Sequence, residues 1–277
     1  MKKISRRSFM AAAAVSVAAL ALTAFGGSAS SAASSVASSA ASSEAVSSAA
    51  AADLTTVEAG KLTMATNAAF PPYEMTTDAG EFEGIDVDTA KAIAEKLGLE
   101  LQIDDMDFDA ALLSVQQGKA DIVMAGVTVT DERKAVMDFS DSYATGIQSI
   151  IVPNDSEIAS PDDLAGKKIG TQRGTTGYIY CSDDFGDENV VAYDDGLTAV
   201  QALNNGQVDA VVIDNAPAQE FVAANPGLKV LDTSYAEEDY AIGMAGSALE
   251  DAVNKALEEL KADGTLQAIV DKYINAN

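Results

Sequence analysis

Two stretches of this chain repeat one pattern, and this repeat constrains the fold more than any other feature of the sequence. ALLSVQQGKADIVMAG at 111–126 and AVQALNNGQVDAVVID at 199–214 each contain a helix-like segment, a glycine and a short apolar run. Gly118 and Gly206 hold the same place in the two stretches, where glycine commonly ends a helix. The repeat therefore predicts two α/β lobes of similar plan.

The apolar runs of the repeat indicate strands that are covered on both faces. Residues 122–125 and 210–213 are continuously apolar, as expected of strands inside a doubly covered sheet. A looser echo precedes them, because GKLTMATNAAF at 60–70 and GKKIGTQRGTT at 166–176 both pass from Gly-Lys through a strand to a small or polar loop. Ligands bind beyond the carboxyl ends of the strands in such sheets.

Matched polar residues and helical spacing support the same plan. Asp121 and Asp209 occupy the same position in the two repeats, directly before the apolar runs. After the first predicted strand, apolar residues at the spacing of one helical face predict an amphipathic helix. These residues are Ala90, Ile93, Ala94 and Leu97.

The composition excludes several classes of protein. With a net charge of −26, the chain does not suit binding to nucleic acid or to an anionic membrane surface. It contains no histidine, which excludes a histidine-based triad and a histidine-ligated zinc site. The single cysteine, Cys181, is expected to be unpaired and partly buried. A length of 277 residues suits one large domain or two smaller ones.

Residues 1–27 are predicted to be an export signal. A basic start at 2–7 precedes an alanine-rich apolar stretch at 9–25, which is the arrangement of a secretory signal. SRRSFM resembles a twin-arginine motif, and an ordinary secretory signal with two arginines explains it equally well. The protein is therefore expected outside the cytoplasmic membrane, in the periplasm or at the outer face of that membrane.

Residues 28–52, mostly serine and alanine, are predicted to be a disordered tether, because such a tract cannot bury enough apolar surface to fold. A tether after a signal suggests anchoring at the cell surface. LTAFGGS resembles a lipoprotein processing site, but Phe25 stands where lipidation needs a cysteine. Two outcomes stay open: release after cleavage, or anchoring through the uncleaved apolar segment.

An arginine follows the apolar run of the first repeat, in AGVTVTDER at 125–133. Arg133 falls in the first turn of a predicted helix, where the helix dipole disfavours a cation, so an ordinary surface role fits poorly. Aligning the repeats places Asp214 at the equivalent strand end of the other lobe. If the lobes face each other, an arginine fork for a carboxylate meets an aspartate for an ammonium. The pair suits a zwitterion.

Five segments, in order and with compatible spacing, carry a resemblance to a known family. They are ATNAAFPPYEM, GIDVDTAKAIAEKLG, the stretch from MDFDAALL to VMDFS, LAGKKIGTQRGTTG and VDAVVIDNAP. Together they resemble the polar amino-acid substrate-binding proteins of ABC transporters (bacterial extracellular solute-binding protein family 3), in particular its glutamine-binding members, over essentially all of 60–277. Each motif alone is weak, whereas the ordered set is specific.

The resemblance implies an α/β, two-lobed periplasmic-binding-protein fold of type II with two hinge crossings. Lobe 1 would comprise residues 53–143 and 241–277, and lobe 2 residues 148–235. The hinges would lie near 143–147 and 236–240.

The resemblance also implies the ligand contacts. Arg133 would bind the α-carboxylate with Thr128, the backbone of Gly126, and the hydroxyls and N–H groups of the RGTTG loop, and Asp214 would bind the ammonium. Two aromatic residues would enclose the ligand, and two amides would line its side-chain pocket. The predicted substrate-binding residues are Asn67, Phe70, Phe108, Gly126, Thr128, Arg133, Gln172, Thr175, Thr176 and Asp214.

Several of these residues have structural alternatives. Thr130 is assigned to a helix N-cap and not to the site. Thr175 and Thr176 can cap a helix and bind an anion at the same time. Asp214, taken alone, could also be a capping residue, and phenylalanines such as Phe70 most often belong to a core.

The amides Asn67 and Gln172 predict an uncharged polar L-amino acid, because they offer donors and acceptors without net charge. Some relatives that bind cationic amino acids have an acid at the position of Asn67. Its absence here places glutamine-like ligands first, small aliphatic ones next and cationic ones last. Arg173 either faces solvent or, turned inward, favours an acidic ligand side chain.

The predicted function is transport: the protein captures a free L-amino acid by closure of its lobes and delivers it to the membrane permease of an ABC importer. It is expected to be a monomer, without cofactor, metal or catalytic residues and without a nucleic-acid partner. The alternative is an enzyme of the cyclohexadienyl or arogenate dehydratase type on the same fold, with Asp214 as the acid. No acid–base pair can be named for that reaction from the sequence.

Overall fold

The computed structural model describes residues 54–274. The predicted export signal at 1–27 and the predicted tether at 28–52 lie outside the described residues. Within residues 54–274, no helix combines the length and the apolar character that crossing a bilayer requires.

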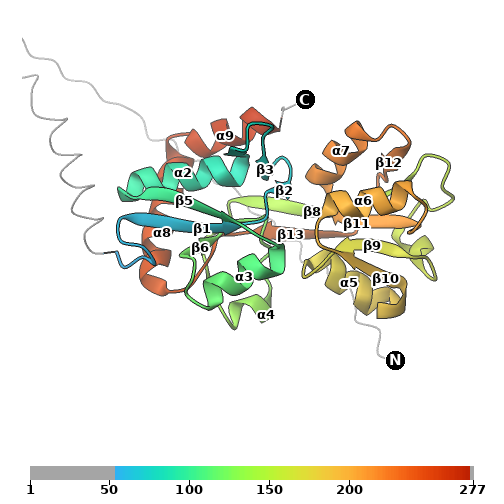
Figure 1. The fold of residues 1–277 in the computed structure, drawn as a ribbon, viewed down its shortest axis with the longest axis horizontal. Helices are drawn as coiled ribbons and strands as arrows, with labels where there is room; N and C mark the ends of the chain where they lie inside the picture. The colour runs from blue at the N-terminus through green and yellow to red at the C-terminus, as the bar shows by residue number, and fades with distance from the viewer. Residues whose placement is uncertain (1–53, 275–277) are drawn as a thin grey trace, which may run out of the picture. The chain divides into compact units, whose positions relative to one another are not determined.

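Lobe 1, as we use the term from here on, is built on a five-stranded sheet with the order β5-β1-β6-β14-β7 (Figure 1). Its strands are β1 (Lys61–Thr66), β5 (Glu100–Asp105), β6 (Ile122–Val123), β7 (Asp138–Phe139) and β14 (Gly243–Met244). Its helices are α2 (Ile85–Leu97), α3 (Phe108–Gln116), α4 (Asp131–Lys134), α8 (Ser247–Ala262) and α9 (Thr265–Tyr273). A small sheet of β2 (Ala69–Phe70), β3 (Glu74–Thr76) and β4 (Phe82–Glu83) lies beside them.

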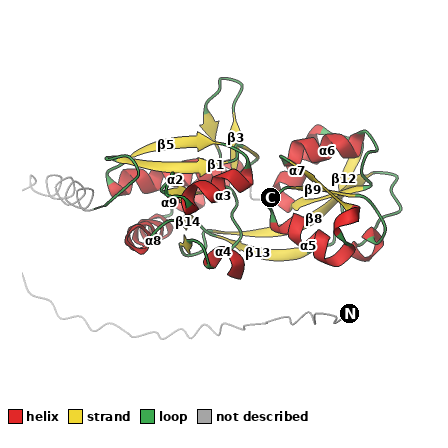
Figure 2. Cartoon of the chain, turned by 60° about the horizontal axis from the view of Figure 1, so that its bottom comes forward, coloured by secondary structure: helices red, strands yellow, loops and turns green. Residues whose placement is uncertain are grey.

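Lobe 2 is built on a six-stranded sheet, in which β10-β9-β11-β8-β12 form the path and β13 pairs with β8. Its strands are β8 (Ala144–Pro153), β9 (Ile169–Gln172), β10 (Val190–Tyr193), β11 (Ala210–Asp214), β12 (Leu228–Val230) and β13 (Ala236–Tyr240). Its helices are α5 (Thr176–Phe185), α6 (Gly196–Asn204) and α7 (Asn215–Ala224), with 3₁₀ turns η1 (Pro161–Leu164) and η2 (Asp187–Asn189). Figure 2 shows the helices packed around the sheets of both lobes.

The chain passes between the two sheets along β8 and β13, which pair with each other in antiparallel register from Ala144↔Tyr240 to Gln148↔Ala236. After β13 the chain adds β14 to the sheet of lobe 1, and α8 and α9 then pack on α2. The C-terminal segment thus rejoins the first lobe. The predicted lobe boundaries and the bending of these strands as hinges stay predictions.

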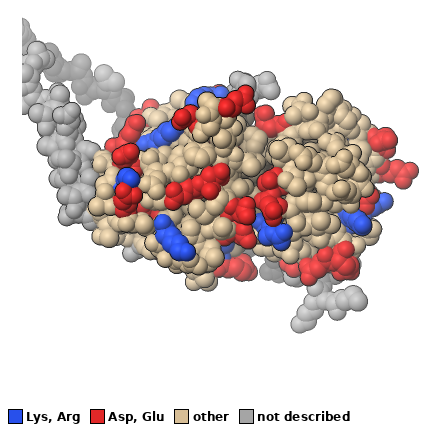
Figure 3. Space-filling model, in the orientation of Figure 1, with Lys and Arg blue, Asp and Glu red and all other residues tan. Residues whose placement is uncertain are grey.

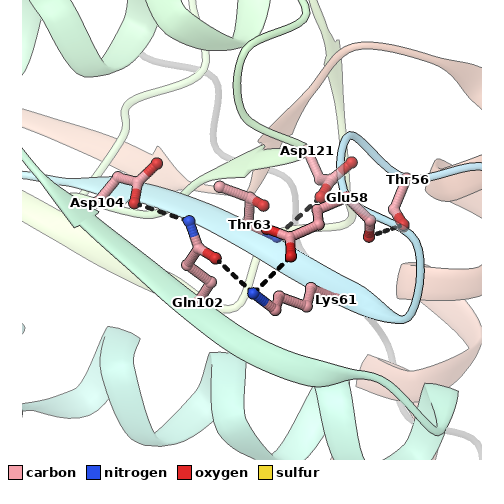
Figure 4. A network of polar contacts seen from close by, with 7 residues as sticks. All are labelled: Thr56, Glu58, Lys61, Thr63, Gln102, Asp104 and Asp121. Carbon is pink, nitrogen blue, oxygen red and sulfur yellow. Dashed lines mark hydrogen bonds and ion pairs between the residues drawn. The ribbon is translucent and has the colours of Figure 1, made fainter.

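The matched aspartates of the repeat make the same contacts in both lobes. In lobe 1 the Thr63 N–H donates to Asp121 Oδ2 at 2.7 Å, and the Asp121 N–H donates to the Thr63 carbonyl at 2.9 Å (Figure 4). In lobe 2 the Lys168 N–H donates to Asp209 Oδ2 at 2.8 Å, and the Asp209 N–H donates to the Lys168 carbonyl at 2.8 Å. Each pair ties the starts of two neighbouring parallel strands together, which confirms the internal repeat.

The glycines and strands of the repeat also lie where the sequence places them, with one difference. Gly118 and Gly206 follow α3 and α6 with φ of +64° and +68°, a conformation that glycine adopts without strain. The predicted strand at 210–213 is β11, but the one at 122–125 is shorter. It ends at Val123 because the following residues turn so that the Gly126 N–H reaches Asp86 Oδ2 at 3.0 Å.

The core covers both faces of both sheets. The predicted apolar face of α2 is buried. Helices α2 and α8 cover one face of the lobe 1 sheet, and α3 covers the other. Cys181 of α5 is free and fully buried, more deeply than predicted. Many acidic residues lie at the surface: Figure 3 shows them spread over the visible face of both lobes, with basic side chains scattered among them.

Gly146 on β8 provides a test of the packing between the two crossing strands. A Cβ at Gly146 would overlap the ring of Tyr240, which is fully buried and bonded through its hydroxyl to Asp214. We therefore expect Gly146→Ala to lower the free energy of unfolding by about 1–3 kcal/mol, the cost of overpacking. Denaturant titration measures it, with Gly227→Ala as the control, because a Cβ at Gly227 meets nothing within 4 Å. Equal stability of the two variants would contradict this account.

Candidate ligand-binding site

A cavity lies between the strand ends of the two lobes. It is lined by Asn67, Phe70, Glu74, Phe108, Ala125, Gly126, Thr128, Arg133, Gln172, Thr175, Thr176 and Asp214. All of the residues predicted from the sequence as substrate-binding are in this lining, and Glu74 and Ala125 are additions. The predicted residues come together because β1, β9 and β11 all end at this cavity, as ligand sites in α/β sheets do.

Arg133 is held at the cavity by backbone carbonyls of both lobes. Its Nη1 donates to the Thr128 carbonyl at 2.7 Å, and its Nη2 donates to the Gly174 carbonyl at 3.1 Å. The guanidinium carbon lies 5.4 Å from the centre of the Phe108 ring. Burial lowers the pKa of Arg133, while the nearby charge of Glu238 acts in the opposite direction. A guanidinium has five N–H donors, so donors remain for an anion in the cavity.

The threonines of the site divide between capping and the cavity. Thr130 caps α4 by accepting the Arg133 N–H at 3.2 Å, as predicted. Thr175 caps α5 by accepting the Tyr178 N–H at 3.3 Å, so its hydroxyl already has a structural role. The hydroxyl oxygens of Thr128 and Thr176, from opposite lobes, lie 3.4 Å apart. Because α5 begins here, its first N–H groups are available to an anion.

Asp214 does not cap the helix that follows it, which answers the alternative raised from the sequence. No hydrogen bond joins its side chain to the first turn of α7. Instead, Oδ2 accepts from Gln148 Nε2 at 2.8 Å, and Oδ1 accepts from the Tyr240 hydroxyl. Burial raises the pKa of Asp214 to about 7, against the opposing effect of the Tyr240 bond. A cation beside this carboxylate would favour its ionised form.

The two predicted pocket amides bond to each other. Gln172 Nε2 donates to Asn67 Oδ1 at 2.9 Å, and Asn67 Nδ2 donates to the Met106 carbonyl at 3.0 Å. Part of their hydrogen-bonding capacity is therefore used within the protein. Arg173, left unassigned by the sequence, turns away from the cavity: its side chain is 52% exposed, and Nη2 lies 3.5 Å from Asp194 Oδ1.

Glu74 is the acidic residue of the cavity that sequence reasoning missed. It is fully buried, and within the described chain neither of its carboxylate oxygens has a hydrogen-bond donor. Burial raises its pKa well above the usual value, and the charge of Asp86 adds to the effect. If protonated, Glu74 can donate to Asp86, which also accepts from the Tyr143 hydroxyl at 2.8 Å and the Gly126 N–H at 3.0 Å. Its position in PPYE was visible in the sequence, but its burial was not.

Three comparisons extend these observations. Residues 62–276 match the model of a family described as bacterial extracellular solute-binding proteins, family 3. The L-cystine-binding protein TcyJ of Escherichia coli K12 is 32% identical over 225 residues, which cover 79% of this chain and 85% of the relative. A solved ancestral arginine-binding protein bound to arginine is 42% identical with a TM-score of 0.74, covering 78% of this chain and 99% of the other. The structure of an ancestral arginine-binding protein bound to glutamine is 41% identical with a TM-score of 0.74, covering 78% and 98%.

Proposed function

Because the chain belongs to family 3 of the bacterial extracellular solute-binding proteins, we propose that its cavity captures a free L-amino acid for the permease of an ABC importer. The type II binding-protein fold predicted from the sequence is confirmed. Members of the family are binding proteins that act outside the cytoplasm, and the chain is not an enzyme. The dehydratase alternative is therefore set aside. Anchoring by the tether, release and a monomeric state stay predictions.

The observation that carries the proposal is the pairing of Arg133 and Asp214 in one buried cavity. An arginine fork binds a carboxylate in two places, and the start of α5 adds N–H donors. An ionised aspartate accepts only, which suits an ammonium. An L-amino acid supplies both groups on one carbon. Since the two anchors come from different lobes, binding should favour lobe closure.

Glu74 supports a cationic side chain on the ligand. A buried carboxylate without a donor is costly, and a guanidinium or ammonium in the cavity would satisfy it. The sequence ranked cationic ligands last because Asn67 is not an acid, but Glu74 on β3 supplies an acid to the same cavity. The hydrogen bond between Asn67 and Gln172 also reduces the number of amide donors and acceptors that remain for an uncharged polar side chain of the ligand. We therefore place arginine and lysine first.

The uncharged polar ligand predicted from the sequence is the second candidate. A protonated Glu74 facing Asp86 is neutral and leaves the cavity without an unpaired charge, which suits a side chain such as that of glutamine. The ancestral arginine-binding proteins solved with arginine and with glutamine support keeping both candidates.

A thermal-shift panel of the twenty amino acids tests the proposal, with L-arginine, L-glutamine, L-glutamate and L-leucine as the deciding comparison. A ligand at about 100 times its Kd stabilises the native state by about 2.7 kcal/mol, which is readily measured. We expect L-arginine to raise the melting temperature most, followed by L-glutamine, with smaller shifts for the other two. A larger shift with L-glutamine would favour the second candidate. No shift with any of the twenty amino acids would remove the proposed function.

A further inference from the structure

Another buried carboxylate, that of Glu238 on β13, lies next to the threonine hydroxyls of the site. Glu238 is 7% exposed, and its Oε2 accepts from Thr176 Oγ1 at 2.9 Å, from Gln148 Nε2 at 3.0 Å and from Thr128 Oγ1 at 3.2 Å. Within residues 54–274 its other oxygen, Oε1, has no partner. One carboxylate oxygen thus accepts from one donor of lobe 1 and from two donors of lobe 2, one of which lies on β8.

A count of hydrogen-bond donors shows the consequence for the ligand. A threonine hydroxyl has one proton to donate, and an ionised carboxylate only accepts. Glu238 Oε2 lies within hydrogen-bond distance of both hydroxyls and can only accept, so each forms this bond by turning its proton to Glu238. The contact between the two hydroxyls is longer, at 3.4 Å. Both hydroxyls then present lone pairs to an incoming carboxylate, which repel it. To use these hydroxyls, the ligand must take their protons from Glu238.

We propose that Glu238 is an internal competitor for the α-carboxylate of the ligand and lowers the affinity of the site. The inference rests on the proposed function, because it concerns the same amino-acid site. A ligand that binds gains two hydroxyl donors only as Glu238 loses them, and it brings a second negative charge close to the one already beside Arg133. Most affinity differences within one site appear in the dissociation rate, so Glu238 would speed release.

Glu238→Gln is the direct test. The carboxamide removes the charge, and its NH₂ can donate to a threonine oxygen, which frees that hydroxyl proton for the ligand. Because hydrogen bonds to charged groups are among the stronger ones, calorimetry with L-arginine and L-glutamine should show affinities about tenfold higher than wild type. Glu237→Gln is the matched control, since Glu237 precedes Glu238 on β13 and is exposed. It should leave both affinities within about twofold, well under the factor of ten that corresponds to 1.4 kcal/mol.

A second ligand distinguishes two roles of Glu238. In the first, Glu238 competes with the ligand carboxylate for the hydroxyl protons; in the second, it only holds the two lobes together. L-argininamide carries an NH₂ group in place of one carboxylate oxygen. This group can donate to the hydroxyl oxygens of Thr128 and Thr176 while their protons stay with Glu238. Glu238→Gln should therefore raise the preference for L-arginine over L-argininamide. If Glu238 only holds the lobes together, Glu238→Gln should change the affinities for L-arginine and L-argininamide by the same factor. Unchanged affinity for L-arginine, or weaker binding with the same acid-to-amide preference, would overturn the inference.

Thr176→Val covers the case in which Glu238→Gln does not fold. By the proposal, this hydroxyl bonds to Glu238 before the ligand arrives and to the ligand afterwards. Removing the hydroxyl should therefore lower the affinity for L-arginine by no more than about threefold, well short of the loss expected for a missing bond to a charged group. The melting temperature of the ligand-free protein should fall, because Glu238 loses a donor. An affinity loss beyond tenfold would overturn the inference. If the wild-type protein binds neither L-arginine nor L-glutamine, the proposed function itself is wrong. If the wild type binds and Glu238→Gln does not change the affinity, only this inference is wrong.

Discussion

Arg133→Ala is expected to abolish useful amino-acid binding while the protein remains folded. The ligand carboxylate would be buried without its cation, and breaking a buried ion pair costs about 3–5 kcal/mol, which is roughly two to four decades in affinity. Calorimetry with the tightest ligand of the panel measures the loss. Arg133→Lys should restore only part of the lost affinity, because three donors on one nitrogen do not replace the planar fork that bonds to the carbonyls of Thr128 and Gly174 and to a carboxylate at once.

Arg173→Ala is the matched control for this result. It removes the same charge from the loop that follows β9, but the Arg173 side chain is half exposed and lies beside Asp194, where an ion pair contributes little. Affinity for the ligand should therefore stay within threefold of wild type. If Arg133→Ala also stayed within threefold, the assignment of Arg133 as the carboxylate anchor would be wrong.

Glu74→Gln is expected to separate the two ligand candidates. If the ligand is cationic, the substitution leaves its charged side chain buried and unpaired, and the affinity for L-arginine should fall by about two decades or more. L-glutamine should change by less than tenfold, because a neutral amide still offers a donor and an acceptor. Glu81→Gln, at an exposed position before β4, is the control and should change neither.

The pH dependence of binding gives an independent check on Glu74. Its pKa is raised by burial first, and then by the neighbouring charges of Asp86, Asp214 and Asp105. A cationic side chain binds the ionised form, whose fraction grows as the pH rises through that raised pKa. The affinity for L-arginine should therefore increase with pH and then level off. The increase should be smaller in Glu74→Gln, in which the raised pKa of Asp214 still gives a rise near pH 7. An affinity that falls over the same range would contradict a cationic ligand.

The same pKa shift predicts how the ligand-free protein responds to pH. Folded Glu74 keeps its proton to a higher pH than the unfolded chain, whose value is near 4.5. Between those two pKa values the native state binds more protons, so the contribution of Glu74 to stability declines as the pH rises. Thermal melts of wild type and Glu74→Gln over this range measure the difference, and saturating L-arginine should reduce it.

The sequence by itself determined the two-lobed plan and brought Arg133 and Asp214 to one cavity, while the family resemblance supplied most of the other lining residues. The repeat at 111–126 and 199–214 has a spacing that only helices and strands of one plan satisfy, and the positions of Arg133 and Asp214 follow from where its strands end. Local patterns also assigned Thr130 to a helix cap. These are properties of neighbouring residues, so they can be read along the chain.

Only the tertiary structure decided which acidic residues are buried and what they face. Glu74 and Glu238 look like the many surface acids of this chain, and their burial depends on strands that approach from distant parts of the sequence. The pairing of Asn67 with Gln172 and the contact of Glu238 with Thr128 join residues from different lobes. The outward turn of Arg173 likewise depends on Asp194, which is distant in sequence. Burial in low dielectric is what gives such carboxyls shifted pKa values and strong preferences for partners, so the electrostatics of the site follow from the packing of the two lobes.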